Sequence, residues 1–157
     1  MSLNASLDLP KNIALVHEWF TPRSTGGAEN VVKAIDDLLT EKASQPELFS
    51  LVNEENLVNN SWLFNRKVRT SFVQKLPFAT SHVQKFLPLL PFAIEQLNLE
   101  GYPLVISSSH LVAKGILTSP EQLHISYVHT PVRYAWDQMN IYLQRSYLWK
   151  EFRIGCR

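Results

Sequence analysis

Ile13–Leu39 has the sequence IALVHEWFTPRSTGGAENVVKAIDDLL, and this stretch decides the fold class of the chain. It opens with a compact apolar run, Ile13–Val16, of the kind that forms a strand buried on both faces of a sheet. A loop rich in turn-forming residues follows and ends at Gly26 and Gly27. From Ala28 onward apolar residues recur at helical spacing, with charged residues between them. The stretch therefore predicts a strand, a glycine loop and a helix in succession.

The rest of the chain repeats this alternation. Further strands are predicted over residues 48–52, 68–72, 102–109 and 123–128. Helices are predicted over residues 81–97, 110–117 and 134–142, the first broken or kinked by Pro88 and Pro91. Strands that alternate with helices favour an α/β layered fold with a mainly parallel sheet. We expect one domain over residues 1–157.

Composition narrows the function classes. The chain has 157 residues, 45% hydrophobic and 18% charged, and its net charge of +1 lacks the basic surplus of a nucleic-acid binder. One cysteine, Cys156, cannot form an internal disulfide, so a reducing, cytoplasmic setting is expected. The first ten residues lack the features of a secretory signal. The sequence contains no apolar run of the ~18 residues that a membrane-spanning helix needs.

Polar side chains gather where the predicted strands end. The first strand is predicted to end at His17 and Glu18, the strand over 102–109 leads into Ser107–His110, and the last strand ends at His129 and Thr130. Parallel α/β sheets bind ligands outside the carboxyl ends of their strands. Convergent polar groups on one rim are what a binding cleft needs, so a cleft is predicted at this edge.

Gly26 and Gly27 open on the same edge. Two glycines let the backbone approach a ligand closely, and the amides at the start of the following helix favour phosphate. The alternative is a plain turn between strand and helix. Of the histidines, His17 and His129 are predicted to be functional, whereas His110 is either functional or only the start of a helix. None is paired at a close metal-binding spacing, so no metal site and no cofactor are predicted.

Residues 86–92 are strongly apolar. The favoured interpretation is a helix packed on the sheet. The alternative is a patch that touches a membrane or a lipid-linked substrate, with Lys75 and Lys85 nearby.

Several of these segments together resemble group-1 (family 4) glycosyltransferases of the GT-B fold, from Ile13 to Tyr142. The matching segments are HEWF at 17–20, GGAE at 26–29, YPLVISSSH at 102–110, AKG at 113–115 and ISYVHTPVRYAWD at 125–137. The resemblance implies the Rossmann-like N-terminal, acceptor-side half of a GT-B enzyme. It also implies an incomplete protein, because the C-terminal domain with its Glu-x7-Glu motif is absent and the tail after Tyr142 differs from the family's continuation.

The resemblance also implies roles for individual residues. Gly26 and Gly27 match the loop that lies near the donor diphosphate, and His129 matches the histidine near the transferred sugar. Family members typically retain anomeric configuration, and the leaving diphosphate is thought to help deprotonate the acceptor, so no protein base is assigned. The residues implied on the acceptor side are His17, Glu18, His110, Arg133, Trp136 and Asp137.

The partners implied are a nucleotide-sugar donor, which needs the missing domain, and a glycan or lipid-linked acceptor. Peripheral contact at the inner face of the membrane fits such an acceptor. The chain alone is expected to be inactive, and an uncovered sheet edge predicts poor solubility or oligomerisation.

Two alternatives stay open. A nicotinamide-dependent dehydrogenase shares the strand, loop and helix opening, but its Gly-x-Gly-x-x-Gly pattern is not met, although Glu54 could mimic the acid that binds the ribose. A non-catalytic remnant, or half of a split enzyme, would keep the motifs without activity of its own.

Overall fold

The computed structural model describes residues 9–22, 26–55, 58–59 and 61–130. In this part of the chain, five strands form one sheet in the order β3-β2-β1-β4-β5, and every neighbouring pair is parallel. The strands are β1 (Ile13–Phe20), β2 (Glu47–Asn53), β3 (Val68–Thr70), β4 (Leu104–Ser109) and β5 (Leu123–Val128). The predicted α/β class with a Rossmann-like parallel sheet is confirmed.

The central strand β1 is longer than predicted. All eight of its residues are buried, including His17 and Glu18. The strand was predicted to end at these two residues, and that boundary is wrong. β1 continues to Phe20 because β2 pairs with it as far as Phe20↔Asn53, while β4 pairs with it as far as His17↔Ser108. The two polar residues therefore lie within the sheet rather than beyond it.

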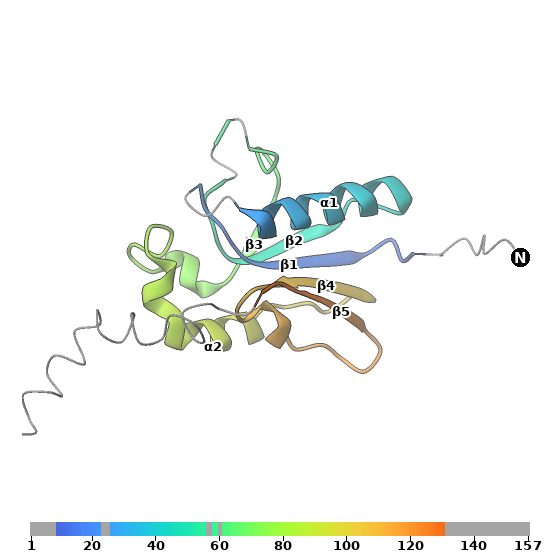
Figure 1. Cartoon of the computed structure of the whole chain (residues 1–157). Helices are drawn as coiled ribbons and strands as arrows, with labels where there is room; N and C mark the ends of the chain where they lie inside the picture. The colour runs from blue at the N-terminus through green and yellow to red at the C-terminus, as the bar shows by residue number, and fades with distance from the viewer. Residues whose placement is uncertain (1–8, 23–25, 56–57, 60, 131–157) are drawn as a thin grey trace, which may run out of the picture.

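The helix α1 (Gly27–Lys42) covers one face of the sheet (Figure 1). Its buried Val32 packs in a cluster with Leu15 and Leu48, and its Leu39 packs with Ile13 of β1. This apolar stripe matches the helical spacing in the sequence. At the start of α1, the Gly26 N–H donates to Oε2 of Glu29 at 2.8 Å, which fixes the entry to the helix.

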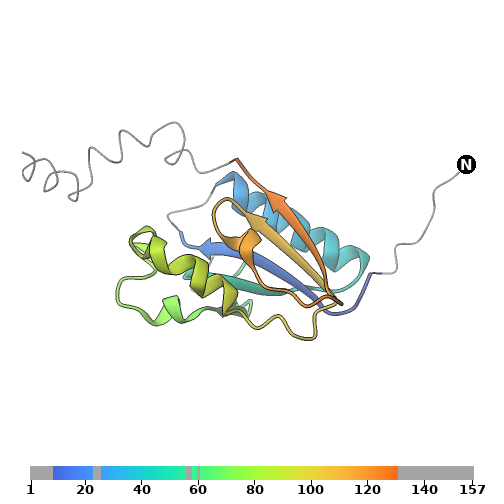
Figure 2. The ribbon, with the colours of Figure 1, turned by 90° about the horizontal axis from the view of Figure 1, so that it is seen from below.

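Short helices cover the opposite face (Figure 2). They are η2 (Phe72–Lys75), η3 (Val83–Leu89), α2 (Leu90–Glu95) and η4 (Ala113–Gly115). Leu90 and Ile94 of α2 pack in the same cluster as Val16 and Val105, so the apolar segment over 86–92 does pack on the sheet. The predicted helix over 81–97 is broken as expected, with Pro88 inside the 3-10 helix η3 and Pro91 in the first turn of α2.

Two predicted elements are corrected. The strand predicted over 68–72 stops at Thr70, because Ser71 leaves the sheet and its Oγ accepts from the Val73 N–H. The helix predicted over 110–117 is wrong: only η4 forms, because the N–H groups of residues 110, 111 and 113 donate to a side chain of β1 instead. The helix predicted over 134–142 lies outside the described residues.

The strand β5 lies at the edge of the described sheet. Its Leu123, Ile125 and Tyr127 are exposed.

At the other side of the molecule, Arg66 forms two hydrogen bonds to the carboxylate of Asp36 in α1, at 2.9 and 2.8 Å. Within the described residues, no helix combines the length and the apolar character needed to cross a membrane.

Candidate functional site

Three strands bring the predicted polar residues together at one edge. β1 supplies His17 and Glu18, the end of β4 leads to His110, and His129 follows β5. Because the strands are parallel, their carboxyl ends lie side by side. His17 Nδ1 donates to the Ser108 carbonyl at 2.9 Å, and Oγ of the same serine lies 2.7 Å from His129 Nε2. Ser108, which belongs to the polar segment predicted at this edge but was given no role of its own, therefore connects two predicted histidines.

The Glu18 carboxylate organises the segment after β4. Its Oε1 atom accepts from Ser109 Oγ at 2.9 Å and from the N–H groups of His110, Leu111 and Ala113 at 3.1, 2.9 and 3.0 Å. The side chain is fully buried, so these four donors replace the water that an exposed carboxylate would bind. Glu18 thus holds the backbone of residues 109–113 against β1.

The second carboxylate oxygen of Glu18 faces the histidines. Its Oε2 atom lies 3.0 Å from His110 Nδ1 and 3.6 Å from His17 Nδ1. The ring of Trp19 packs edge-on against His110, with 4.8 Å between ring centroids, which restricts the orientation of the imidazole. Burial alone would raise the pKa of Glu18, but the close approach and charge of His110, then the charge of His17, hold this pKa well below its ordinary value.

Glu29 links the glycine loop to the histidine cluster. Its Oε2 atom accepts from the Gly26 N–H, while its Oε1 atom lies 4.0 Å from His17 Nε2. Burial opposes ionisation of Glu29, but the interaction with His17 and the backbone hydrogen bonds outweigh it and lower its pKa. A carboxylate at this place also complements the positive end of the α1 dipole.

His129 favours its neutral form. Burial, followed by the charges of His17 and His110, lowers its pKa below the ordinary value of 6.5. A neutral imidazole can accept or donate a hydrogen bond at neutral pH. His129 is therefore equipped to position a hydroxyl group rather than to supply a positive charge.

Among the described residues, His17, Glu18 and His110 offer ligand atoms that lie within 4.8 Å of one another. Their chain spacing gave no sign of this group. Two imidazoles and a carboxylate can bind a divalent metal. However, His17 Nδ1 already donates to Ser108, so its free Nε2 lies on the side of Glu29 rather than of Glu18. The arrangement supports an ion pair between Glu18 and His110 better than a metal centre.

Gly27 has no steric reason to be glycine in this structure. A Cβ atom added there would meet no heavy atom within 4 Å, and Gly101 is the glycine in the described part whose φ is positive. The start of α1 is thus an open surface that a ligand's charged group could approach. Arg133, Trp136 and Asp137, which were predicted for the acceptor side, lie outside the described residues.

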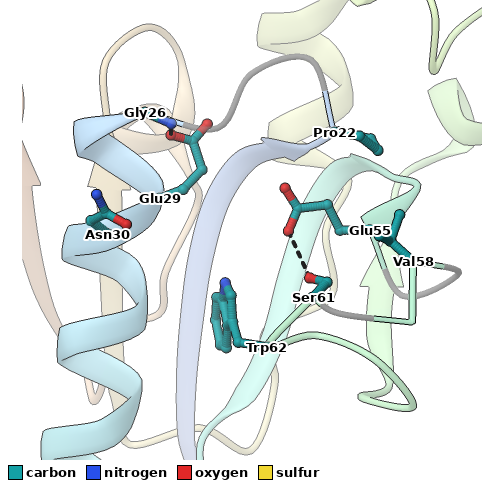
Figure 3. A pocket seen from close by; sticks show the side chains of 8 residues that line it. All are labelled: Pro22, Gly26, Glu29, Asn30, Glu55, Val58, Ser61 and Trp62. Carbon is teal, nitrogen blue, oxygen red and sulfur yellow. Dashed lines mark hydrogen bonds between the residues drawn. The ribbon is translucent and has the colours of Figure 1, made fainter.

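A pocket with a volume of about 440 Å³ lies beside the start of α1 (Figure 3). It is bounded by Gly26, Glu29 and Asn30 on one side and by Glu55, Ser61 and Trp62 on the other. The sequence shows residues 53–60 as a polar stretch, and no pocket was predicted there. The feature that distinguishes this loop is the burial of Glu55, and the composition of the loop does not reveal that burial.

Comparisons of the chain with protein-family models, curated proteins and solved structures give no match in any of the three.

Proposed function

We propose that this chain forms the acceptor-side part of a glycosyltransferase that uses a nucleotide-sugar donor. The observation that carries the proposal is the connection from the glycine loop to the histidines. The Gly26 N–H is hydrogen-bonded to Glu29, whose carboxylate lies 4.0 Å from His17. His17 and His129 are both hydrogen-bonded to Ser108. A diphosphate binding surface and a hydroxyl-positioning group thus share one edge of the sheet.

The start of α1 is suited to the donor diphosphate. The positive end of the helix dipole stabilises negative charge, which grows on the diphosphate as the bond to the sugar breaks. The absence of a side chain at Gly27 leaves room for close backbone approach. In the enzymes that the chain resembles, a second domain grips the nucleotide, so donor binding requires that domain as well.

His129 would position the transferred sugar and the accepting hydroxyl. In the retaining reaction that the resemblance implies, the donor's sugar–oxygen bond breaks, the acceptor oxygen bonds to the same carbon, and the acceptor proton passes to the leaving diphosphate. No protein base is then needed. Glu18 acts as a positioning residue, because it fixes residues 109–113 and the imidazole of His110 beside the same edge.

The test is a transfer assay on the chain expressed with whatever coding sequence continues it in frame. Nucleoside diphosphate release would be measured across a panel of nucleotide sugars, with glycan and lipid-linked acceptors. We expect release that needs both donor and acceptor and that falls in His129→Ala but not in Glu41→Gln, an exposed control. The chain alone should show no turnover. Release that His129→Ala leaves unchanged would contradict the assignment.

Contact with a membrane surface belongs to the same proposal. Phe78 and Phe92 are 78% and 56% exposed, and Phe92 lies 5.9 Å from the exposed Phe72, measured between ring centroids. Apolar side chains near Lys75 and Lys85 suit an anionic bilayer surface. Flotation with anionic vesicles should recover the protein, and Phe78→Ser should reduce the recovered fraction. Failure to bind such vesicles would contradict the proposed contact with a membrane surface.

Glu54 favours a second candidate, a dinucleotide-dependent dehydrogenase. It directly follows β2, where an acid binds the ribose in such enzymes. Against this, Gly26 and Gly27 are adjacent, and no further glycine follows in α1. A fluorescence titration with reduced nicotinamide cofactor separates the two candidates, because only the dehydrogenase should bind the nicotinamide.

A further inference from the structure

The pocket between α1 and the loop after β2 contains a buried polar atom that lacks a partner. Glu55 is 4% exposed, and its Oε2 atom accepts from Ser61 Oγ at 3.0 Å. Among the residues that the structure describes, its Oε1 atom has no hydrogen-bond partner. Figure 3 shows this carboxylate turned toward the α1 side of the pocket, with the hydrogen bond to Ser61 drawn as a dashed line. Buried carboxylate oxygens are normally satisfied, so the free oxygen calls for a donor from outside the chain.

The backbone holds Glu55 in this position. Its N–H donates to Asn53 Oδ1 at 3.2 Å, directly at the end of β2. The Oγ atom of Ser61, which donates to Glu55, also accepts a hydrogen bond from the N–H of Leu63, a core residue. The carboxylate is therefore fixed before any ligand arrives, and its free oxygen does not swing toward solvent.

The charges around the pocket select against ionic ligands. On the side of the pocket away from the start of α1, the buried carboxylate of Glu55 would repel an anion. The start of α1 borders the same space and would repel a cation through the positive end of its dipole. A neutral group that donates hydrogen bonds fits both constraints. Hydroxyl groups have this property.

Trp62 and Asn30 suit a sugar ring. The indole of Trp62 is fixed edge-to-face against Phe20, with ring centroids 6.1 Å apart and the planes at 87°. A fixed indole offers a flat apolar surface to the C–H face of a sugar. Asn30 is exposed on α1 and adds an amide that both donates and accepts hydrogen bonds.

We propose that this pocket binds the vicinal diol of a sugar, with the free oxygen of Glu55 accepting from its hydroxyls. The diol could belong to the ribose of a nucleoside or to a neutral hexose. An acid just after the second strand and beside the first helix is the arrangement that binds ribose hydroxyls in Rossmann folds. The inference depends on the pocket alone and does not rest on the glycosyltransferase proposal.

The experiment is ligand-observed NMR and calorimetry on the full chain. Adenosine and uridine form the ribose arm, glucose and mannose form the hexose arm, and inorganic phosphate and ethanolamine are the charged probes. We expect one diol arm to bind and 2′,3′-dideoxyadenosine, which lacks the diol, to bind no better than background. A ribose result would identify a nucleoside site, and a hexose result would identify a glycan site.

Variants assign the binding to Glu55. Glu55→Gln keeps an oxygen for Ser61 but places an amide where the free oxygen was, so affinity should fall about tenfold or more. Glu41→Gln, an exposed glutamate near the far end of α1 and outside the pocket lining, is the matched control and should bind normally. Asn30→Ala lies on an exposed helix position, should fold, and should weaken binding severalfold. The proposal is overturned if no diol binds to the folded chain, if a charged probe binds better, or if Glu55→Gln and Asn30→Ala both bind as wild type.

Discussion

Oε2 of Glu18 lies 3.0 Å from Nδ1 of His110, although the two residues are 92 positions apart in the chain. The pair joins the middle of β1 to the segment that follows β4. The other oxygen of Glu18 satisfies three backbone N–H groups of that segment, so one carboxylate supports both the fold and the candidate site.

Removing Glu18 should therefore destabilise the chain. Glu18→Ala leaves four buried donors without an acceptor, and we expect the free energy of unfolding to fall by about 3–5 kcal/mol. Glu18→Gln retains one amide oxygen and should lose about 1–3 kcal/mol. Urea unfolding followed by circular dichroism measures both. Equal stability of Glu18→Ala and wild type would mean that the network contributes nothing.

The same carboxylate should make stability depend on pH in the acid range. The pKa of Glu18 is lower in the folded chain than its ordinary value of 4.5, so the unfolded chain binds the proton more readily. The stability that the ionised Glu18 contributes is complete well above pH 4.5. It is lost as the pH falls below 4.5 toward the pKa of Glu18 in the folded chain. Between about pH 5 and pH 3, the free energy of unfolding should fall more steeply for wild type than for Glu18→Gln. Parallel curves for the two proteins would contradict the assignment.

The parts of the fold that could be predicted from the sequence are those determined by residues close together in the chain. The runs that became β2 and β5 are apolar or β-branched, and short-range pattern was enough to find them. The HEWF segment was taken as the end of a strand because His17 and Glu18 are polar. Partners from β4, such as the Ser108 carbonyl, and from the segment after it make the burial of these two side chains favourable. Such partners are remote in sequence and leave no local signal.

The segment after β4 also shows that remote partners can override a local sequence pattern. Serines before residues 110–117 favour a helix start, yet the N–H groups that would be capped there donate to Glu18. A tertiary acceptor thus replaced a local cap. Likewise, the polar composition of residues 53–60 indicates a loop, but not that Glu55 turns inward from it.

The pair of Arg66 and Asp36 should contribute strongly to stability. Asp36 is buried, and Arg66 binds both its oxygens and the carbonyl of Pro46. Arg66→Ala leaves the carboxylate buried and unpaired, so a loss of about 3 kcal/mol is expected. Arg66→Lys keeps the charge but not the paired geometry, and should lose less. Arg69→Ala, which breaks the exposed pair with Glu47, is the control and should change stability by under about 1 kcal/mol.

His129 should be neutral at neutral pH. Its pKa is lowered, so the folded chain binds this proton less readily than the unfolded chain does, and the resulting stability is lost as the pH falls below the ordinary value of 6.5. NMR titration of the imidazole should give a midpoint below this value. A midpoint for His129 above 6.5 would contradict the account.

The most direct test of the central claim is the transfer rate of Gly27→Ala. The added Cβ meets no neighbour, so its folding stability should equal or exceed that of wild type by up to about 1 kcal/mol. If a donor diphosphate approaches the backbone at this glycine, sugar transfer by the chain with its in-frame continuation should fall at least about tenfold, the effect of losing one such interaction. Transfer by Gly27→Ala at the wild-type rate would show that the glycine loop does not hold the donor.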